Sequence, residues 1–185
     1  MDLENKLEKI TEKTVPLYIM IVIMILTSAP TVLSRVFGLP LVLAGEALRI
    51  WAAGHIQKND EVTTSGPYGY IQSPLYLGSF IILTGLSLIA NAAIIWILST
   101  IIFIFSYVPR KQKTEWGRME RIFGEQFIKY KNAVPYFIPK SAVPYAEGAK
   151  HPWSFKAMIE NTEHQTGIVV LVIAFLVARG GLFNS

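Results

Sequence analysis

Long apolar runs separated by short polar stretches make up most of this chain. The runs cover about Val15 to Leu33, Leu39 to His55, Leu75 to Ala90, Ala92 to Val108 and Gly167 to Ala178. A helix needs roughly 20 apolar residues to cross a bilayer, and the shorter last run reaches that length with its flanking residues. The pattern therefore predicts an all-α integral membrane protein with about five transmembrane helices in one membrane domain, residues 1–185.

The breaks between the runs predict how these helices connect. The stretch RVFGLP predicts a tight turn between the first two helices, and Pro30 bends or ends the first. The third and fourth runs meet at Asn91, so short a connection that it predicts an antiparallel hairpin. Pro109 and the basic run RKQK predict the end of the fourth helix.

A different period follows the fourth run. Residues 113–132, KTEWGRMERIFGEQFIKYKN, place apolar residues three and four apart, which predicts an amphipathic helix. VPYFIP then breaks it, and an irregular polar segment continues to about residue 165. We divide the chain into a mixed-charge N-terminal helix (1–14), a first hairpin (15–56), a central region (57–140), and a connector with the last span (141–185).

Charge predicts the orientation of this arrangement in a membrane. Ten of the 17 lysines and arginines lie between residues 110 and 156, and lysines also precede the first span. The positive-inside rule then predicts a cytoplasmic N-terminus, cytoplasmic segments 56–74 and 110–165, and a C-terminus on the opposite side. Because topology explains the basic excess, we expect the bilayer as a partner and no nucleic acid.

Other kinds of site find little support in the residues. The chain has no cysteine, which excludes disulfides and thiolate metal ligands. Its three histidines lack the spacing of metal ligands, so we expect no metal, and no glycine-rich loop has a phosphate-binding spacing.

Two separated motifs in the central region resemble a known family. GPYGYIQSPLYLG and EWGRMERIFGEQFIKYKNAVPYFIP are similar to the two signature segments of isoprenylcysteine carboxyl methyltransferases and phospholipid methyltransferases, and GEALRIWAAGHI resembles a helix upstream of them. The resemblance covers roughly residues 42–140. The chain departs from the family pattern at Gln72-Ser73, in place of Arg-His, and at Trp116, in place of the second of two glutamates. Phe127 and Tyr136 stand where tyrosine and arginine are usual.

The resemblance implies a methyltransferase that binds S-adenosylmethionine on the cytoplasmic side and takes a lipophilic or lipid-linked acceptor from the bilayer. It implies Glu115 and Tyr76 as catalytic residues. The implied cofactor-binding residues are Gln72, Ser73, Pro74, Tyr76, Gly78, Arg110, Lys111, Glu115, Arg118, Tyr130 and Tyr136. Ionisable residues within spans are functional candidates by default, so we expect Glu46 and Arg49 to contact the substrate.

The chemistry of methyl transfer restricts the chemical class of the acceptor only in part. Methyl transfer from a sulfonium mainly requires alignment and exclusion of water. A carboxylate or thiolate acceptor needs no strong base, whereas an amine or neutral thiol must lose a proton. Glu115 is the one carboxylate that the motifs place well, so the sequence predicts a site poor in bases.

Two other functions remain open on the sequence alone. The replaced motif residues also fit a catalytically degenerate family member that binds lipid or assists membrane assembly. An NADPH-dependent membrane reductase is the third reading, since sterol reductases share a related architecture. Structural roles compete as well: Tyr76 in an interfacial aromatic belt, Pro74 at a helix start, Gly78 in helix packing and Arg49 reaching toward the membrane surface.

Overall fold

The structure is a computed structural model that describes residues 15–16, 18–56, 61–148 and 151–181. These residues are mainly helical and include no β-strand, which confirms the all-α prediction for the described part of the chain. The expected N-terminal helix, residues 1–14, lies outside them.

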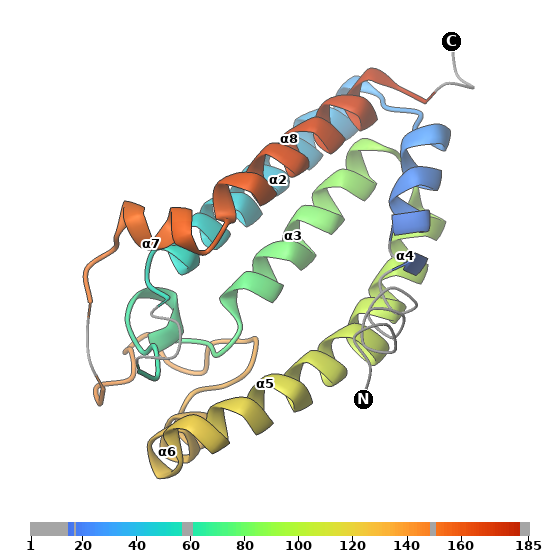
Figure 1. The fold of residues 1–185 in the computed structure, drawn as a ribbon. Coiled ribbons are helices and arrows are strands. Elements are labelled where there is room, and N and C mark those ends of the chain that lie inside the picture. The colour runs from blue at the N-terminus through green and yellow to red at the C-terminus, as the bar shows by residue number, and fades with distance from the viewer. Residues whose placement is uncertain (1–14, 17, 57–60, 149–150, 182–185) are drawn as a thin grey trace, which may run out of the picture.

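Helices of very different length make up the fold. An apolar helix, Tyr18–Thr27, precedes α2 (Val32–Ala53), and a short 3-10 helix, η1 (Gly66–Gly69), leads to α3 (Pro74–Ile89). The chain continues through α4 (Ala93–Ile102), a π-helix η2 (Phe103–Tyr107), α5 (Val108–Phe123), α6 (Glu125–Ala133), α7 (Phe155–Glu160) and α8 (Glu163–Arg179). In Figure 1, α2 and α8 form one arm, α4 to α6 form the other, and α3 lies between them.

Glycines let α2 and α3 pack unusually closely. Gly38 and Gly45 on α2 face Gly85 and Gly78 on α3, and each pair of glycines within a helix is seven residues apart. A Cβ atom on Gly85 would lie 2.8 Å from the carbonyl oxygen of Gly38, and one on Gly78 would lie 2.8 Å from that of Gly45. Small residues at such an interface allow backbones to approach, which strengthens packing between helices in a membrane.

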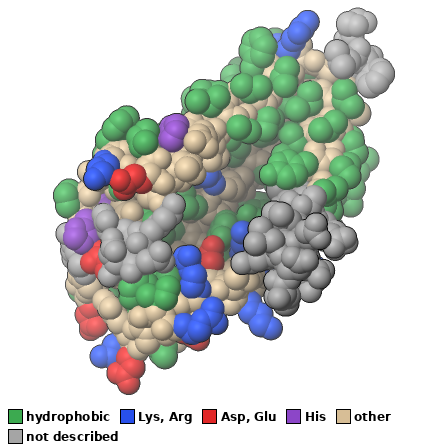
Figure 2. Space-filling model, in the orientation of Figure 1, with side chains coloured by type: hydrophobic (Ala, Val, Ile, Leu, Met, Phe, Trp, Pro, Cys, Tyr) green, Lys and Arg blue, Asp and Glu red, His purple; other side chains and the backbone are tan. Residues whose placement is uncertain are grey.

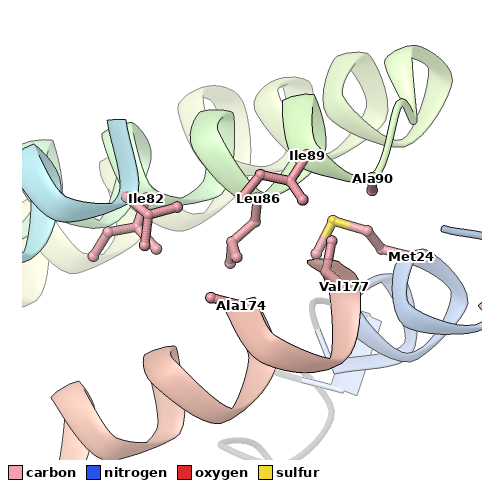
Figure 3. Packing of buried hydrophobic residues seen from close by; sticks show 8 residues of the cluster. Met24, Ile82, Leu86, Ile89, Ala90, Ala174 and Val177 are labelled. Carbon is pink, nitrogen blue, oxygen red and sulfur yellow. The ribbon is translucent and has the colours of Figure 1, made fainter. Parts of the chain in front are cut away.

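The apolar core lies at the end of this contact, away from the motif segments. It joins α2, α3, α8 and the helix before α2 (Figure 3), and its buried members are Met24, Val42, Ile82, Leu86, Ile89, Ala90, Ala174 and Val177. The buried Ser28 hydroxyl donates to the Val177 carbonyl at 2.7 Å, which ties α8 to the turn before α2.

The predicted turn at RVFGLP is wrong. These residues lie inside α2, and the chain breaks earlier, between residues 28 and 31. Thr31 and Ser34 form a capping box that begins α2, with each side chain bonded to the other residue's backbone N–H. Because Gly38 packs on α3, tertiary contacts hold the helix through Pro40 despite its missing N–H.

Pro109 does not end the fourth helix, contrary to the prediction. The π-helix η2 comes directly before α5, and Pro109 stands in the first turn of α5, where a missing N–H costs little. Helix therefore runs from Ala93 to Phe123. The break comes instead at Gly124, whose φ of 53° ends α5 and divides the predicted amphipathic helix. The predicted hairpin at Asn91 is confirmed, with a φ of 56° there.

The exterior is typical of a membrane-associated protein. Among the described residues, Val32–Ala53 and Ala93–Phe123 are long and apolar enough to cross a bilayer, whereas Tyr18–Thr27 and Pro74–Ile89 are shorter apolar helices. Large apolar side chains cover the outer faces of the arms (Figure 2), among them Leu33, Phe37, Leu43, Phe105 and Phe175. The count of about five spans and the orientation of the termini stay predictions.

Candidate functional site

The two motif segments meet where the arms are joined. The backbone N–H groups of Gln72 and Ser73 donate to the carbonyls of Pro135 and Tyr136, at 2.9 and 3.2 Å. These bonds resemble a short strand pairing and hold the segment after α6 against the start of α3. The sequence predicted that both motifs face one site, and the structure brings them into contact.

A cavity of about 220 Å³ lies between these segments. It opens into the hollow that Figure 2 shows between the two arms. Its walls come from the loop after α2, η1, the first turn of α3, α5 and α6. The lining residues are Ile56, Glu61, Val62, Thr63, Tyr68, Gln72, Ser73, Leu75, Tyr76, Glu115, Trp116, Arg118, Met119, Phe127, Tyr130 and Tyr136.

Tyr76 and Glu115 form a polar contact in the wall of the cavity. The Tyr76 hydroxyl, on the first turn of α3, donates to Oε1 of Glu115 on α5. Tyr107 packs edge-on against Tyr76, with ring centroids 5.8 Å apart. Tyr107 ends the π-helix, and such insertions are frequent at functional sites. The sequence pairs Tyr76 with Glu115 only through the motifs, and it carries no signal for Tyr107.

Two positions that depart from the family pattern are bonded to each other. Nε1 of Trp116 donates to Oε1 of Gln72 at 3.0 Å. The Gln72 amide nitrogen donates to the carbonyls of Lys131, at 3.0 Å, and Val134. Lys131 in turn places Nζ 4.7 Å from the centre of a Trp116 ring. Gln72 therefore ties the start of α3 to α5 and to the end of α6, and its polar atoms are occupied by the protein.

The side chains of Tyr136 and Tyr130 also line the cavity. Burial raises the pKa of Tyr136 to about 12, against a smaller opposing effect of the Ser73 hydroxyl, so this phenol is neutral at physiological pH. The Tyr136 ring meets Trp116 edge-on, with centroids 6.1 Å apart. The buried Tyr130 hydroxyl donates to the Tyr68 carbonyl at 2.8 Å, so Tyr130 also fastens α6 to η1.

The cations expected for the cofactor do not all reach the cavity. Arg118 lines it, whereas Arg110 and Lys111 lie about two turns before Arg118 on α5 and are exposed. Lys111 instead places Nζ 5.8 Å from the centre of the Tyr107 ring. Pro74 begins α3 and is buried, and Gly78 faces Gly45 and Arg49 on α2, so neither residue lines the cavity.

Glu46 and Arg49 belong to a separate polar cluster between α2, α3 and α8. Arg49 binds both carboxylate oxygens of Glu163, at 2.8 and 2.9 Å, and donates to the Ser79 hydroxyl at 2.6 Å. Glu163 is 3% exposed. Glu46 lies beside Gly167, one turn farther along α8. Sequence reasoning missed Glu163, although an acid in the first turn of the last helix, on the same predicted side as Arg49, was a usable signal.

Glu61 is a second carboxylate in the cavity wall that the sequence did not single out. Its Oε1 lies 2.8 Å from Nε2 of His151, and its side chain is 20% exposed. Glu61 lies in a loop without periodicity, and its partner is 90 residues away. Nothing in the sequence pattern indicated the pairing. Within the described residues, no group of three or more potential metal ligands lies together.

The sequence model of the phospholipid methyltransferase family matches residues 33–126, half of the chain. The chain belongs to this family. The matched region runs from the start of α2 to the start of α6 and includes Tyr76, Glu115 and most of the cavity wall.

The proteins to which this chain is similar include two described as metal-resistance proteins and one described as a methyltransferase. The nickel-cobalt-cadmium resistance protein NccN of Alcaligenes xylosoxydans xylosoxydans is 27% identical, over 71% of this chain and 62% of its own length. The cobalt-zinc-cadmium resistance protein CzcN of Cupriavidus metallidurans is 28% identical, over 69% and 60%. A protein-S-isoprenylcysteine O-methyltransferase of Schizosaccharomyces pombe is 25% identical, over 54% and 42%. This chain thus spans less than two thirds of each relative's length. No solved structure matches it significantly.

Proposed function

We propose that the chain is a membrane methyltransferase that uses S-adenosylmethionine and methylates a lipophilic or lipid-linked acceptor. The observation that carries this proposal is the cavity itself. Both motif segments line it, and Tyr76 and Glu115, one from each segment, are hydrogen-bonded to each other in its wall. Membership in the phospholipid methyltransferase family and the similarity to an isoprenylcysteine O-methyltransferase support the same class of reaction.

The residues of the cavity suit the chemical parts of this cofactor. Aromatic faces attract a positive charge such as a sulfonium, and Tyr76, Trp116 and Tyr136 supply them. We expect Glu115 to accept hydrogen bonds from the cofactor's amino group and Arg118 to bind its carboxylate, since both line the cavity. The volume of about 220 Å³ is below the roughly 300–1,000 Å³ of typical ligand clefts, so we expect ligands to extend into the hollow between the arms.

One part of the protein's contribution to the reaction is alignment of the reactants and exclusion of water. When bound, the cofactor supplies an electrophilic methyl group. Tyr76 holds the Glu115 carboxylate in one orientation through its hydroxyl, and the bonds of Gln72 fix α5 relative to the start of α3. Rigid positioning of this kind lowers the barrier to a group transfer, because the reacting groups are already aligned when they bind.

Calorimetry of the detergent-purified chain with S-adenosylhomocysteine tests the proposal. We expect binding by the wild type and an affinity about 10–100-fold lower for Glu115→Gln, since a hydrogen bond to a charged group contributes about 1.5–3 kcal/mol. Glu125→Gln, on the exposed face of α6, is the matched control and keeps the wild-type affinity. No binding by the wild type at millimolar ligand contradicts the function, and unchanged binding by Glu115→Gln contradicts the role of Glu115.

A further inference from the structure

The Glu61 carboxylate faces the cavity on one side and a histidine on the other. Its Oε1 is buried and makes no hydrogen bond of standard geometry within the described part of the chain. Nε2 of His151 lies 2.8 Å from this oxygen and forms an ion pair with it when the imidazole is protonated. A carboxylate that lies between a cavity and an ionisable histidine can exchange a proton with either, which points to a role beyond packing.

His151 connects this carboxylate to water. Its side chain is 43% exposed, about twice the exposure of Glu61. Its position is fixed from two directions: Nδ1 of His55 lies 3.1 Å from the His151 carbonyl, and the N–H of Ser154 donates to the Gly54 carbonyl at 2.9 Å. The segment before α7 is thereby fastened to the end of α2, with Glu61 inside and His151 outside.

The charges in the cavity favour one class of acceptor. Among the described lining residues, the charged side chains are Glu61, Glu115 and Arg118, and the other titratable ones are tyrosines at 68, 76, 130 and 136. Glu115 is already bonded to Tyr76. The described lining thus carries two carboxylates and one guanidinium, and this excess of negative charge disfavours an acceptor carboxylate and favours a group that brings a proton.

We propose that Glu61 takes the proton of the methyl acceptor and that His151 passes it to water, so the acceptor is an amine or a thiol rather than a carboxylate. This inference rests on the function proposed above. The N–H bond of the acceptor's ammonium form, or the S–H bond of its thiol, breaks, and its proton moves to the Glu61 carboxylate. The freed electron pair forms the bond to the methyl carbon, while the sulfonium–methyl bond breaks and leaves its pair on sulfur. The proton then moves from Glu61 to Nε2 of His151 and from the exposed ring to solvent. Glu61 is the catalytic residue in this step, and His151 acts through it.

Three probes with one alkyl chain and different head groups test the proposal: dodecylamine, dodecanethiol and dodecanoate. The full chain is reconstituted in phosphatidylcholine vesicles, which carry no primary amine, and supplied with methyl-labelled S-adenosylmethionine. We expect label on dodecylamine or dodecanethiol and none on dodecanoate. Because each probe is assayed separately, the result shows whether the amine or the thiol is the head group that is methylated. Base treatment checks the product, since it releases methanol from a methyl ester but leaves N-methyl and S-methyl groups intact.

Substitutions separate the proton route from cofactor binding. We expect Glu61→Gln to slow transfer by about 10²–10⁴-fold at pH 7, the usual contribution of general acid–base catalysis, with unchanged affinity for S-adenosylhomocysteine. The loss shrinks as pH rises, because more acceptor is then already deprotonated. His151→Asn shifts the acidic limb of the pH–rate profile. Glu160→Gln, in an exposed pair with Lys156 at 3.7 Å, is the control and keeps the wild-type rate.

The outcomes are distinguishable. Failure of the wild type to bind S-adenosylhomocysteine overturns the proposed function, and this inference with it. Normal binding together with transfer to dodecanoate, or with a full rate in Glu61→Gln, overturns the inference alone. Should no probe be methylated, the three are compared as ligands of the S-adenosylhomocysteine complex by calorimetry. Tightest binding of dodecanoate, or no effect of Glu61→Gln on the other two, then overturns it as well.

Discussion

A single methyl group at Gly85 should separate α2 from α3. The Cβ atom of Gly85→Ala would lie 2.8 Å from both the carbonyl oxygen of Gly38 and the backbone nitrogen of Val42. Both atoms belong to the α2 backbone, so no side chain can turn aside to make room. Ordinary carbon contacts need about 3.5 Å or more, and α2 must therefore move by more than half an ångström along this contact.

The expected cost follows from two opposing effects. Overpacking a close interface typically costs about 1–3 kcal/mol, while replacing glycine by alanine inside a helix returns up to about 1 kcal/mol. We expect a net loss of about 1–2 kcal/mol, which lowers the apparent melting temperature by about 2–8 °C for a chain of this size. The assay is thermal unfolding of the purified chain in detergent, followed by circular dichroism.

Gly117→Ala is the matched control, since it makes the same change within a helix but meets only the far end of Arg121, at 3.9 Å. It should raise the apparent melting temperature by a few degrees, because the helix gains propensity and nothing is displaced. Equal melting temperatures for the two variants would refute the reasoning, since they would mean that the glycine contact between α2 and α3 does not limit the approach of the helices.

Two further predictions concern polar groups. Glu163→Gln leaves the Arg49 guanidinium buried without its bidentate partner, so we expect a loss of about 3–5 kcal/mol, largely recovered in the Arg49→Met/Glu163→Leu double variant; comparison of the melting temperatures checks this, and equal losses in both would contradict it. Burial raises the pKa of Tyr136 from an ordinary 10 to about 12, so its stabilisation is complete below pH 10 and is lost as pH rises toward 12. Melting temperatures between pH 9 and 12 should fall less steeply in Tyr136→Phe, and parallel curves would count against this assignment.

Local patterns predicted the elements that local chemistry determines. Pro74 marks the start of α3, Asn91 adopts the left-handed conformation of the hairpin, and the three- and four-residue period after residue 113 is helical until Gly124. The two motif segments were expected on one site because the family pattern joins them, and Tyr76 and Glu115 do meet. Neighbouring residues carry the signal for the helix boundaries and the hairpin, whereas the meeting of Tyr76 and Glu115 was predicted only through the resemblance to the family.

The failures come from contacts between distant residues. RVFGLP has the composition of a turn, but packing of Gly38 against α3 keeps it helical. Pro109 has the signature of a helix stop, but the π-helix before it changes what the proline must satisfy. Neither the Arg49–Glu163 pair nor the Glu61–His151 pair follows a period, because each joins residues about a hundred positions apart.

The length of the helix from Ala93 to Phe123 can also be compared with the thickness of a bilayer. At 1.5 Å per residue its 31 residues extend about 46 Å, whereas the hydrocarbon layer of a bilayer is about 30 Å thick. With Ala93 at one boundary of that layer, Glu115 stands about 33 Å along the axis, just past the other boundary. With that placement, Glu115 in the cavity wall lies at the level of the lipid head groups, a depth that suits the water-soluble donor and the lipid-dissolved acceptor of the proposed reaction.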